Sequence, residues 1–321
     1  MIGAMNAEQP YRPGIRTPGP RVLIAAALVS LMLMMPGPLI PCPDAEDRMV
    51  RDQAGRSVRV PADPRRVVAL APSVTEIVFA LKQAHRLVGA TRFSDYPAEA
   101  EQIPKVGSYV RLDLEKITAL APDLCIAVKD GNPVDVVMRL EALNIPVYAV
   151  DPRSLDTVMT AIRAVGELLN APEAAASMVG EMQRRISRVR RLAATAETRP
   201  GVFFQIGVNP IVSAGTPTFI HELIIAAGGR NLAAGDIPYP RFSREEVLMT
   251  APDILIITSM ARGGLFEKVK REWMAWPDMP AVRNRRVHIL DSDVLDRPGP
   301  RMVEGLEQLF DIIHPGLGDR E

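Results

Sequence analysis

One long helical run between two similar halves constrains the fold of this chain more than any other feature. From Pro172 to about Thr195, alanines and straight-chain residues predominate, and the apolar residues Met178, Met182 and Ile186 recur on one face. At 1.5 Å per residue, roughly 24 residues span about 36 Å, which is longer than a small lobe needs for its own packing. The run predicts a rigid connecting helix, although a surface helix of a single domain would show the same pattern.

The flanking halves both alternate short apolar runs with helical patterns, which predicts parallel sheets with crossover helices. In the first half, the expected strands are 67–70, 87–90, 124–127 and 147–150, and the expected helices are 75–81, one from 114, 134–143 and 155–169. In the second half, the expected strands are 202–206, 254–257 and 287–290, and the expected helices are 218–227, one from 245, 265–273 and 302–313.

A weak internal repeat favours the two-lobed interpretation. Glu115 precedes Pro122-Asp123 by the same spacing with which Glu245 precedes Pro252-Asp253, and apolar residues match between the two segments. We therefore predict an α/β fold of two Rossmann-like lobes with parallel sheets, joined by one long rigid α-helix. The cleft between such lobes is a preferred ligand site, and a continuous helix should allow only modest closure of it. The expected divisions are a signal or anchor segment 1–42, a flexible polar segment 43–57, an N-terminal lobe 58–171, the helix 172–195, a C-terminal lobe 196–314 and a tail 315–321.

The N-terminal segment has the layout of an export signal. Three arginines precede the apolar run 22–35, which a Pro-Gly-Pro sequence at 36–38 then breaks. Residues 39–42 resemble the box before a lipidated cysteine, except that Pro41 stands where a small residue is usual. The expected location is periplasmic or extracytoplasmic, and the sequence leaves open whether the segment is cleaved, lipidated at Cys42 or retained as an anchor. Cys125, by contrast, lies in an apolar run and is expected to be a buried hydrophobe.

The charge balance and the motifs exclude several classes of protein. Lys plus Arg and Asp plus Glu both number 38, so the chain carries no electrostatic footprint for nucleic acid. Glycine-rich phosphate loops, nucleophile elbows and His-Glu-x-x-His are absent from the sequence, and its four histidines are scattered. We expect neither an enzyme nor a metal site. The only acid-base pair that an enzyme could use at the cleft is Asp95 with Asp293.

The chain from about Arg66 to Phe310 resembles the periplasmic substrate-binding proteins of ABC importers that have a helical backbone (class III), and among these the cobalamin-binding members. The resemblance implies an expected monomer that captures a corrinoid, either cobalamin or a related cobamide, and delivers it to an inner-membrane permease with its ATPase subunits. The matching segments are 66–76, Ser94-Asp95-Tyr96-Pro97, Leu114-Glu115-Lys116-Ile117, Ala121-Pro122-Asp123, 205–210, Gly228-Gly229-Arg230-Asn231, 243–248, Ser292-Asp293 and Pro300-Arg301.

The resemblance also implies which residues contact the ligand. A corrin offers a broad apolar face and a rim of amides, which suits aromatic walls with a few polar groups. Aromatic residues of the family pattern appear here as Val128 and Ile206, so the pocket is expected to be wider or to fit a different cobamide. The positions that match the family's ligand contacts are Phe93, Tyr109, Val128, Ile206, Tyr239, Asp293 and Arg297.

Glu115 and Glu245 match the paired glutamates with which the family docks onto arginines of its permease. Taken singly, an acid in the first turn of a helix is explained by the helix dipole. As a pair at equivalent places in two lobes, the two glutamates favour docking. Trp273 and Trp276 are the only tryptophans, and they are expected to serve packing.

Two other ligand classes fit the same fold. Haem would need an axial side chain at the cleft, for which Tyr109 or Tyr239 could serve. An anionic ferric siderophore would need converging basic residues. The candidates for that role are Arg111, Lys129, Arg241 and Arg297. The metal-binding relatives would require several histidines with a carboxylate in the cleft, which the scattered histidines oppose.

Overall fold

The computed structural model describes residue 14 and residues 47–258 and 265–318. Residues Ala45–Glu321 form one compact unit. The signal segment with its apolar run and Cys42 lie outside the described residues. Within 47–258 and 265–318, the structure contains no helix that is long and apolar enough to cross a membrane.

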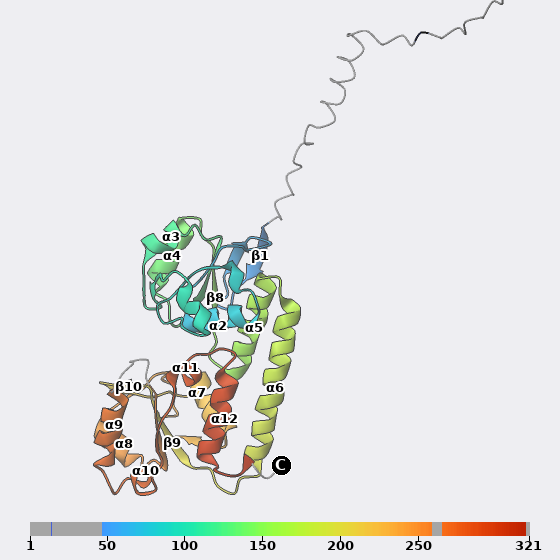
Figure 1. Ribbon diagram of the computed structural model, residues 1–321. Helices are drawn as coiled ribbons and strands as arrows, with labels where there is room; N and C mark the ends of the chain where they lie inside the picture. Colours follow the sequence, from blue (N-terminus) through green and yellow to red (C-terminus); the bar gives the residue numbers. More distant parts are fainter. Residues whose placement is uncertain (1–13, 15–46, 259–264, 319–321) are drawn as a thin grey trace, which may run out of the picture. The chain divides into compact units, whose positions relative to one another are not determined.

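The N-terminal lobe is built on a parallel sheet with strand order β4-β3-β7-β8 (Figure 1). Its central strands are buried throughout, which explains why they read as unbroken apolar runs. The strands are β3 (Val67–Ala69), β4 (Leu87–Ala90), β7 (Leu124–Val128) and β8 (Val147–Val150), and a small hairpin pairs β5 (Gly107–Ser108) with β6 (Arg111–Leu112). The helices are α2 (Pro72–Ala80), α3 (Leu114–Ala119) and α4 (Val134–Ala142), with 3₁₀ turns at Ala84–Arg86 and Ala98–Gln102.

The C-terminal lobe has a parallel sheet of the same kind, with strand order β12-β9-β14-β15. In both sheets the first strand lies between the second and the third. The strands are β9 (Gly201–Gln205), β12 (Arg230–Asn231), β14 (Ile254–Ile257) and β15 (Val287–Ile289), and a small antiparallel sheet joins β10 (Gly207–Val208), β11 (Ile211–Val212) and β13 (Arg241–Phe242). The helices are α7 (Phe219–Ala226), α8 (Arg244–Met249), α9 (Leu265–Met274), α10 (Pro280–Arg283), α11 (Ser292–Leu295) and α12 (Met302–Ile313).

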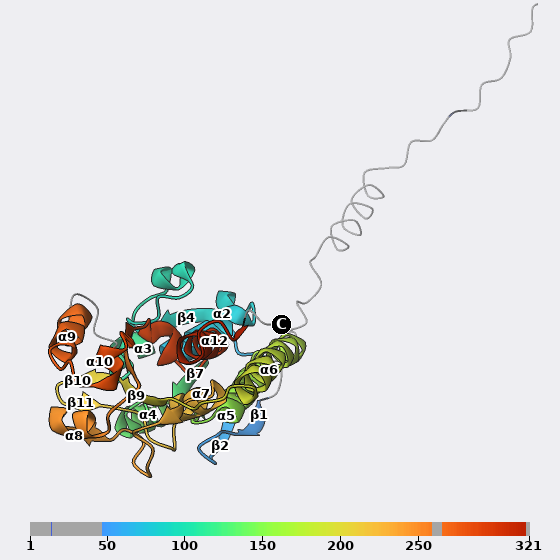
Figure 2. The ribbon, with the colours of Figure 1, turned by 90° about the horizontal axis from the view of Figure 1, so that it is seen from below.

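The predicted connecting helix is confirmed as α6 (Pro172–Ala194), which packs against α5 (Leu155–Leu168) and against α7 and α12 of the C-terminal lobe. Helices α5 and α6 lie side by side in both ribbon views (Figure 1 and Figure 2). Met182, Ile186 and Val189 are buried on one face of α6, and this face belongs to a single hydrophobic core that reaches both lobes. The sequence missed the role of α5. Its first turn is tied to the other lobe, because the amide of Leu155 donates to Glu222 Oε2 of α7 at 2.7 Å.

The prediction that 43–57 is a flexible segment was wrong for its described residues. Residues Arg48–Arg51 form strand β1, which pairs antiparallel with β2 (Ser57–Val60). The polar composition hid a two-residue period, since Val58 and Val60 are buried while their neighbours are exposed. The turn between the strands is closed by Asp52, whose carboxylate accepts from the backbone amide of Arg56 at 2.8 Å.

The internal repeat is visible in the backbone as well. Helices α3 and α8 both begin at a side-chain cap, formed by Asp113 and by Ser243. Both are followed by an alanine with positive φ, 41° at Ala121 and 45° at Ala251. The Pro-Asp pair comes next, and each aspartate accepts backbone amides from the start of the neighbouring strand: Asp123 from Arg65 and Arg66, and Asp253 from Gly201.

The sequence also predicted that Cys125, the single cysteine among the described residues, would be buried and that both tryptophans would serve packing. Cys125 is fully buried in β7, as predicted, and burial raises the pKa of its thiol to about 12. Trp273 is buried in α9, as a packing residue should be, and its Nε1 donates to Gln205 Oε1 at 2.8 Å. Trp276 lies beyond the end of α9 and is 41% exposed, so the packing prediction was wrong for this residue.

Candidate ligand-binding site

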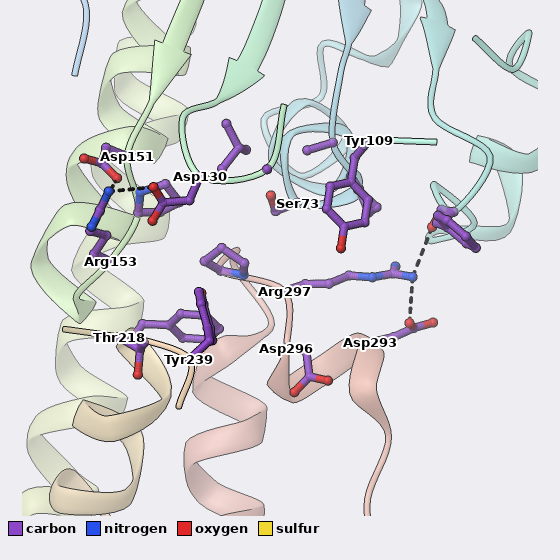
Figure 3. Close-up of a pocket in the computed structure, with 18 of the residues that line it drawn as sticks. Ser73, Tyr109, Asp130, Asp151, Arg153, Thr218, Tyr239, Asp293, Asp296 and Arg297 are labelled. Atoms are coloured by element: carbon purple, nitrogen blue, oxygen red, sulfur yellow. Dashed lines mark hydrogen bonds and ion pairs between the residues drawn. The ribbon is translucent and has the colours of Figure 1, made fainter. Parts of the chain in front are cut away.

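A pocket lies where the carboxyl ends of the strands and the adjoining loops of the two lobes meet (Figure 3). Its cavity volume is about 230 Å³, within ≈ 1090 Å³ of open space that includes the solvent-facing mouth. The N-terminal lobe contributes Ala71, Pro72, Ser73, Phe93, Tyr109, Val128, Asp130, Gly131, Asp151, Pro152 and Arg153. The C-terminal lobe contributes Pro217, Thr218, Phe219, Tyr239, Asp293, Asp296, Arg297 and Pro298.

Asn132 fixes the aromatic wall on the N-terminal side. Its amide nitrogen donates to the carbonyls of Leu70 and Tyr109, both at 2.8 Å, and its Oδ1 accepts from the amide of Val128 at 2.7 Å. A buried amide with all three bonds satisfied holds the ends of two loops in one arrangement. The neighbouring Gly131 lets the ring of Tyr109 approach, since a Cβ at that position would lie 3.1 Å from Tyr109 Cδ2.

The two tyrosines of the pocket come from opposite lobes. Tyr109 follows β5 of the N-terminal lobe, and Tyr239 lies in the loop before β13 of the C-terminal lobe. Burial raises the pKa of both phenols, and nearby aspartates raise it further. Both groups are therefore neutral hydroxyls at physiological pH, and each presents an aromatic ring with a polar tip.

A buried ion-pair network joins the lobes at one side of the pocket. Arg297 lies within 2.9 Å of Glu76, 3.1 Å of Asp95 and 2.6 Å of Asp293, and it donates to the carbonyl of Phe93 at 3.0 Å. The second arginine of the network, Arg301, makes a bidentate contact with Glu76 at 2.7 and 2.9 Å. Its guanidinium also lies 3.8 Å from the centre of the Tyr96 ring. We call the two arginines with Glu76, Asp95 and Asp293 the interlobe network.

A second cation, Arg153, lies at the opposite side of the pocket. Its Nε donates to Asp151 at 2.8 Å and its Nη2 to Asp130 at 2.5 Å (Figure 3). The hydrogen bond to Asp151 raises the pKa of the guanidinium, and Lys129 pairs with Asp151 as well, at 2.9 Å. Both arginines of the pocket are thus held by carboxylates of the protein.

Asp296 is the most perturbed acid of the site. It caps the end of α11, and its Oδ1 accepts from the hydroxyl of Thr258 at 2.9 Å. Burial raises the pKa of this carboxyl to about 7, the hydrogen bond from Thr258 opposes the shift, and the charges of Asp293 and Asp291 add to it. The group changes charge near neutral pH.

The positions that the sequence assigned to the ligand are brought together with one exception. Phe93, Tyr109, Val128, Tyr239, Asp293 and Arg297 all line the pocket. Ile206 does not, because it lies partly buried against the hydrophobic core at the end of β9. The arrangement brings the predicted residues around one cavity, and their contact with a ligand stays a prediction.

Several polar residues of the pocket were not assigned to the ligand from the sequence. Asp130 follows β7, and Asp151 and Arg153 follow β8, so their position after strand ends was the available signal. Asp296 lies one helical turn from Asp293 and could have been found from that spacing.

The basic residues considered for a siderophore are not brought together at the pocket, whereas both tyrosines considered for haem line it. Of the four basic residues considered for a siderophore, only Arg297 lines the pocket, while Arg111 and Arg241 are exposed and Lys129 is paired with Asp151. Among the described residues, no group of three or more His, Cys, Asp or Glu could hold a metal ion. Asp95 and Asp293, the acid-base pair considered for an enzyme, both contact Arg297.

The two glutamates assigned to docking lie away from the pocket. Glu115 is in the first turn of α3 and Glu245 in the first turn of α8, and both side chains are exposed. The structure records no ion pair for either of them within the described residues. They occupy the same position in the repeated unit, one in each lobe.

Two similar α/β lobes, a connecting helix and a pocket between them define a solute-binding protein. The chain belongs to the periplasmic binding protein family, whose model matches residues 67–294. A vitamin B12-binding protein from Photorhabdus laumondii is 32% identical over 249 residues, which cover 77% of this chain and 87% of that protein. An ABC transporter substrate-binding lipoprotein of Bacillus subtilis, YvrC, is 29% identical over 272 residues, which cover 83% and 85%.

A solved structure with the same fold carries a different ligand in its name. The periplasmic heme-binding protein RhuT from Roseiflexus sp. RS-1 superposes with a TM-score of 0.70 at 30% identity and covers 79% of this chain and 99% of that chain. The relatives are solute-binding proteins, not enzymes, and the family is extracytoplasmic. The protein is accordingly a substrate-binding protein of the ABC-transporter type.

Proposed function

We propose that this protein captures a corrinoid, cobalamin or a related cobamide, in the interlobe pocket and delivers it to the inner-membrane permease of an ABC importer. The observation that supports this most is the combination of aromatic rings and hydrogen-bonding groups around one cavity. Phe93, Tyr109, Phe219 and Tyr239 offer apolar faces, while the carboxylates of Asp130, Asp151, Asp293 and Asp296 offer acceptors. A corrin has the complementary surface, with an apolar ring and a rim of amide donors.

Haem is the second candidate, because two tyrosines line the pocket and a heme-binding protein shares the fold at 30% identity. Burial favours the neutral phenol at both positions, so an iron-bound phenolate would have to form by loss of a proton when haem binds.

Absorbance titration of the purified protein with cyanocobalamin, cobinamide, haem and a ferric hydroxamate tests the proposal. We expect saturable binding of the two corrinoids. Saturable binding of haem or of the hydroxamate, with no binding of either corrinoid, would overturn the proposal.

Delivery to the permease is assigned to Glu115 and Glu245. Two exposed carboxylates at equivalent points of two lobes fit a pair of arginines on a transporter with two similar halves, and such contacts act mainly through association and its salt dependence. We further propose that the protein acts as a monomer. For the N-terminus, lipidation at Cys42, cleavage of the signal and its retention as an anchor remain alternative proposals. Intact mass of the protein from the membrane fraction distinguishes the three.

A further inference from the structure

The charged residues that line the pocket are unequally divided between acids and bases. The acids are Asp130, Asp151, Asp293 and Asp296, and the bases are Arg153 and Arg297. A pocket with more carboxylates than guanidiniums has a negative potential, which the low polarity of its aromatic walls strengthens. The lining therefore opposes a ligand that carries negative charge.

Both guanidiniums of the lining already have carboxylate partners in the protein. Arg297 has only 10% of its side chain exposed and is held by three carboxylates and a carbonyl. Arg153 is held by Asp151 and Asp130. A carboxylate on a ligand would therefore compete with protein carboxylates for either guanidinium, and any carboxylate that it displaced would stay in the pocket without its partner.

Asp296 differs from the other three acids of the lining. Asp130, Asp151 and Asp293 each have an ion pair with an arginine, whereas the described residues give Asp296 the hydroxyl of Thr258 and no ion pair. Its charge is therefore the least compensated in the pocket. A carboxyl in this state accepts hydrogen bonds from amides and hydroxyls and, when ionised, repels other carboxylates.

We infer that this pocket selects ligands whose rim is made of uncharged hydrogen-bond donors and rejects those whose rim carries carboxylates, and that Asp296 is the residue that sets this specificity. The inference deepens the proposed function, because it rests on the interlobe pocket and names the chemistry of the ligand's edge. A corrinoid with amide side chains satisfies the requirement. A porphyrin with two carboxylates does not.

Two pairs of ligands test this inference independently of which macrocycle is bound. Haem and its dimethyl ester share a macrocycle and differ in whether the carboxylates are masked. Cobinamide and cobyrinic acid share a corrin ring, but the side chains of the ring end in amides in cobinamide and in carboxylates in cobyrinic acid. The wild-type protein should bind the uncharged member of each pair about tenfold more tightly or better.

Exchange of Asp296 for Asn keeps the size of the side chain and an oxygen that can accept from Thr258. We expect D296N to lose most of the preference for the uncharged member, while D296E retains it. The matched control is D291N, since Asp291 is exposed in the same loop and does not line the pocket. Thermal unfolding of each variant shows that the folded protein is being compared.

The preference for the uncharged ligand should also depend on pH in the wild type but not in D296N. The carboxyl of Asp296 has a pKa of about 7, so its charge increases from pH 6 to pH 8 while ligand carboxylates stay ionised. The charged and titratable groups that face it are Asp291, Asp293 and Arg297 from its own segment, and Tyr109 and Tyr239 across the pocket. The preference for the uncharged ligand should therefore rise with pH in wild type and stay level in D296N.

The outcomes separate this inference from the proposed function. An equal change in affinity for both members of a pair in D296N, or an equal effect of D291N, would overturn the role of Asp296. Wild-type protein that binds the carboxylate members as tightly as the uncharged ones would overturn the selection itself. Failure to bind any corrinoid, with the ester preferred over haem, would overturn the corrinoid proposal and leave the selection standing.

Discussion

The two lobes share a frame and differ in the loops that face the pocket. Both have four parallel strands in the same order, and both carry a short capped helix, an alanine with positive φ and a Pro-Asp pair. At the pocket, however, the N-terminal lobe contributes a wall held by Asn132 and a charged group in which Arg153 pairs with Asp130 and Asp151, whereas the last loop of the C-terminal lobe contributes Asp293, Asp296 and Arg297. The repeated frame sets the geometry, and the unlike loops set the chemistry.

The two lobes also differ at the ends of the central strands, directly beneath the loops of the pocket. The central strands of the C-terminal lobe end in buried polar residues, Gln205 and Thr258, which bind Trp273 and Asp296. The corresponding strand ends in the N-terminal lobe are apolar, with Leu70 and Val128. The hydroxyl of Thr258 supports the charge of Asp296 from below, whereas the charged residues of the N-terminal loops, Asp130, Asp151 and Arg153, hold one another.

The largest expected effect concerns Glu115 and Glu245, which occupy the same position in the two lobes. Exchange of both Glu115 and Glu245 for Ala should abolish ligand transport by the reconstituted importer and leave ligand affinity unchanged, because both side chains are exposed and distant from the pocket. Uptake of labelled ligand into vesicles and a binding titration measure the two quantities separately.

The single variants sharpen this comparison of the lobes. If docking uses both lobes equally, Glu115→Ala and Glu245→Ala should weaken transport to a similar degree and make it more sensitive to salt. Glu267→Ala removes an exposed acid from the first turn of α9 and should transport normally. Weakened ligand binding together with intact permease docking in the double variant would contradict the assignment.

The second effect in size concerns the interlobe network. Glu76 is 3% exposed and is bound by both Arg297 and Arg301, so Glu76→Gln leaves Arg301 with a neutral partner and removes one of the three carboxylates around Arg297. Arg297 keeps Asp95 and Asp293, so the main loss falls on Arg301, and we expect a decrease of roughly 3 kcal/mol in the free energy of unfolding. Chemical denaturation checks this value.

The matched control is the ion pair between Arg185 of α6 and Glu307 of α12. It is also bidentate, at 2.6 and 2.9 Å, but about a third of each side chain is exposed. Glu307→Gln should lower the free energy of unfolding by about 1 kcal/mol or less. Equal losses in the two variants would show that burial of the interlobe network does not determine its contribution.

A third test compares two buried asparagines, one in each lobe. Asn132→Ala leaves the amide of Val128 and the carbonyls of Leu70 and Tyr109 without a partner, and Asn231→Ala does the same to the carbonyl of Ala214 and the amide of Ala233. Each substitution should lower the free energy of unfolding by roughly 2 kcal/mol.

Only the first of these variants should also weaken ligand binding, by about tenfold, because Asn132 holds two residues of the pocket wall while Asn231 holds none. Denaturation and the absorbance titration together distinguish the two roles. An equal loss of affinity in both variants would show that overall stability, rather than the position of the wall, governs binding.

The sequence predicted the frame well, because the signals for the frame are local. The apolar runs of β7 and β14, the one-face pattern of α6 and the repeated Pro-Asp spacing all depend on residues close together in the chain. The hairpin of β1 and β2 was missed because a four-residue strand with two buried valines carries too short a period to recognise.

The chemistry of the pocket was predicted only in part, for a different reason. The resemblance to a family gave the aromatic positions, but the partners of Arg297 lie more than 200 residues away in the chain, at Glu76 and Asp95. No local pattern reports that contact. The resemblance to the family placed Ile206 in the pocket, whereas in the structure this side chain packs against the hydrophobic core just after the end of β9.

The smallest effect tests the equivalence of the lobes at a single backbone position. Ala121 has φ of 41° and Ala251 has φ of 45°, in the region where a Cβ costs an L-residue about 1–2 kcal/mol. Exchange for Gly removes that cost and adds roughly 0.5–1 kcal/mol of backbone entropy in the unfolded chain. Each variant should therefore be more stable than the wild type by about 0.5 kcal/mol. Ala119→Gly, at the last residue of α3, has no positive φ to relieve and should lose a similar amount instead. A gain at only one of the two repeated sites would show that the lobes, although built on the same turn, do not carry the same strain.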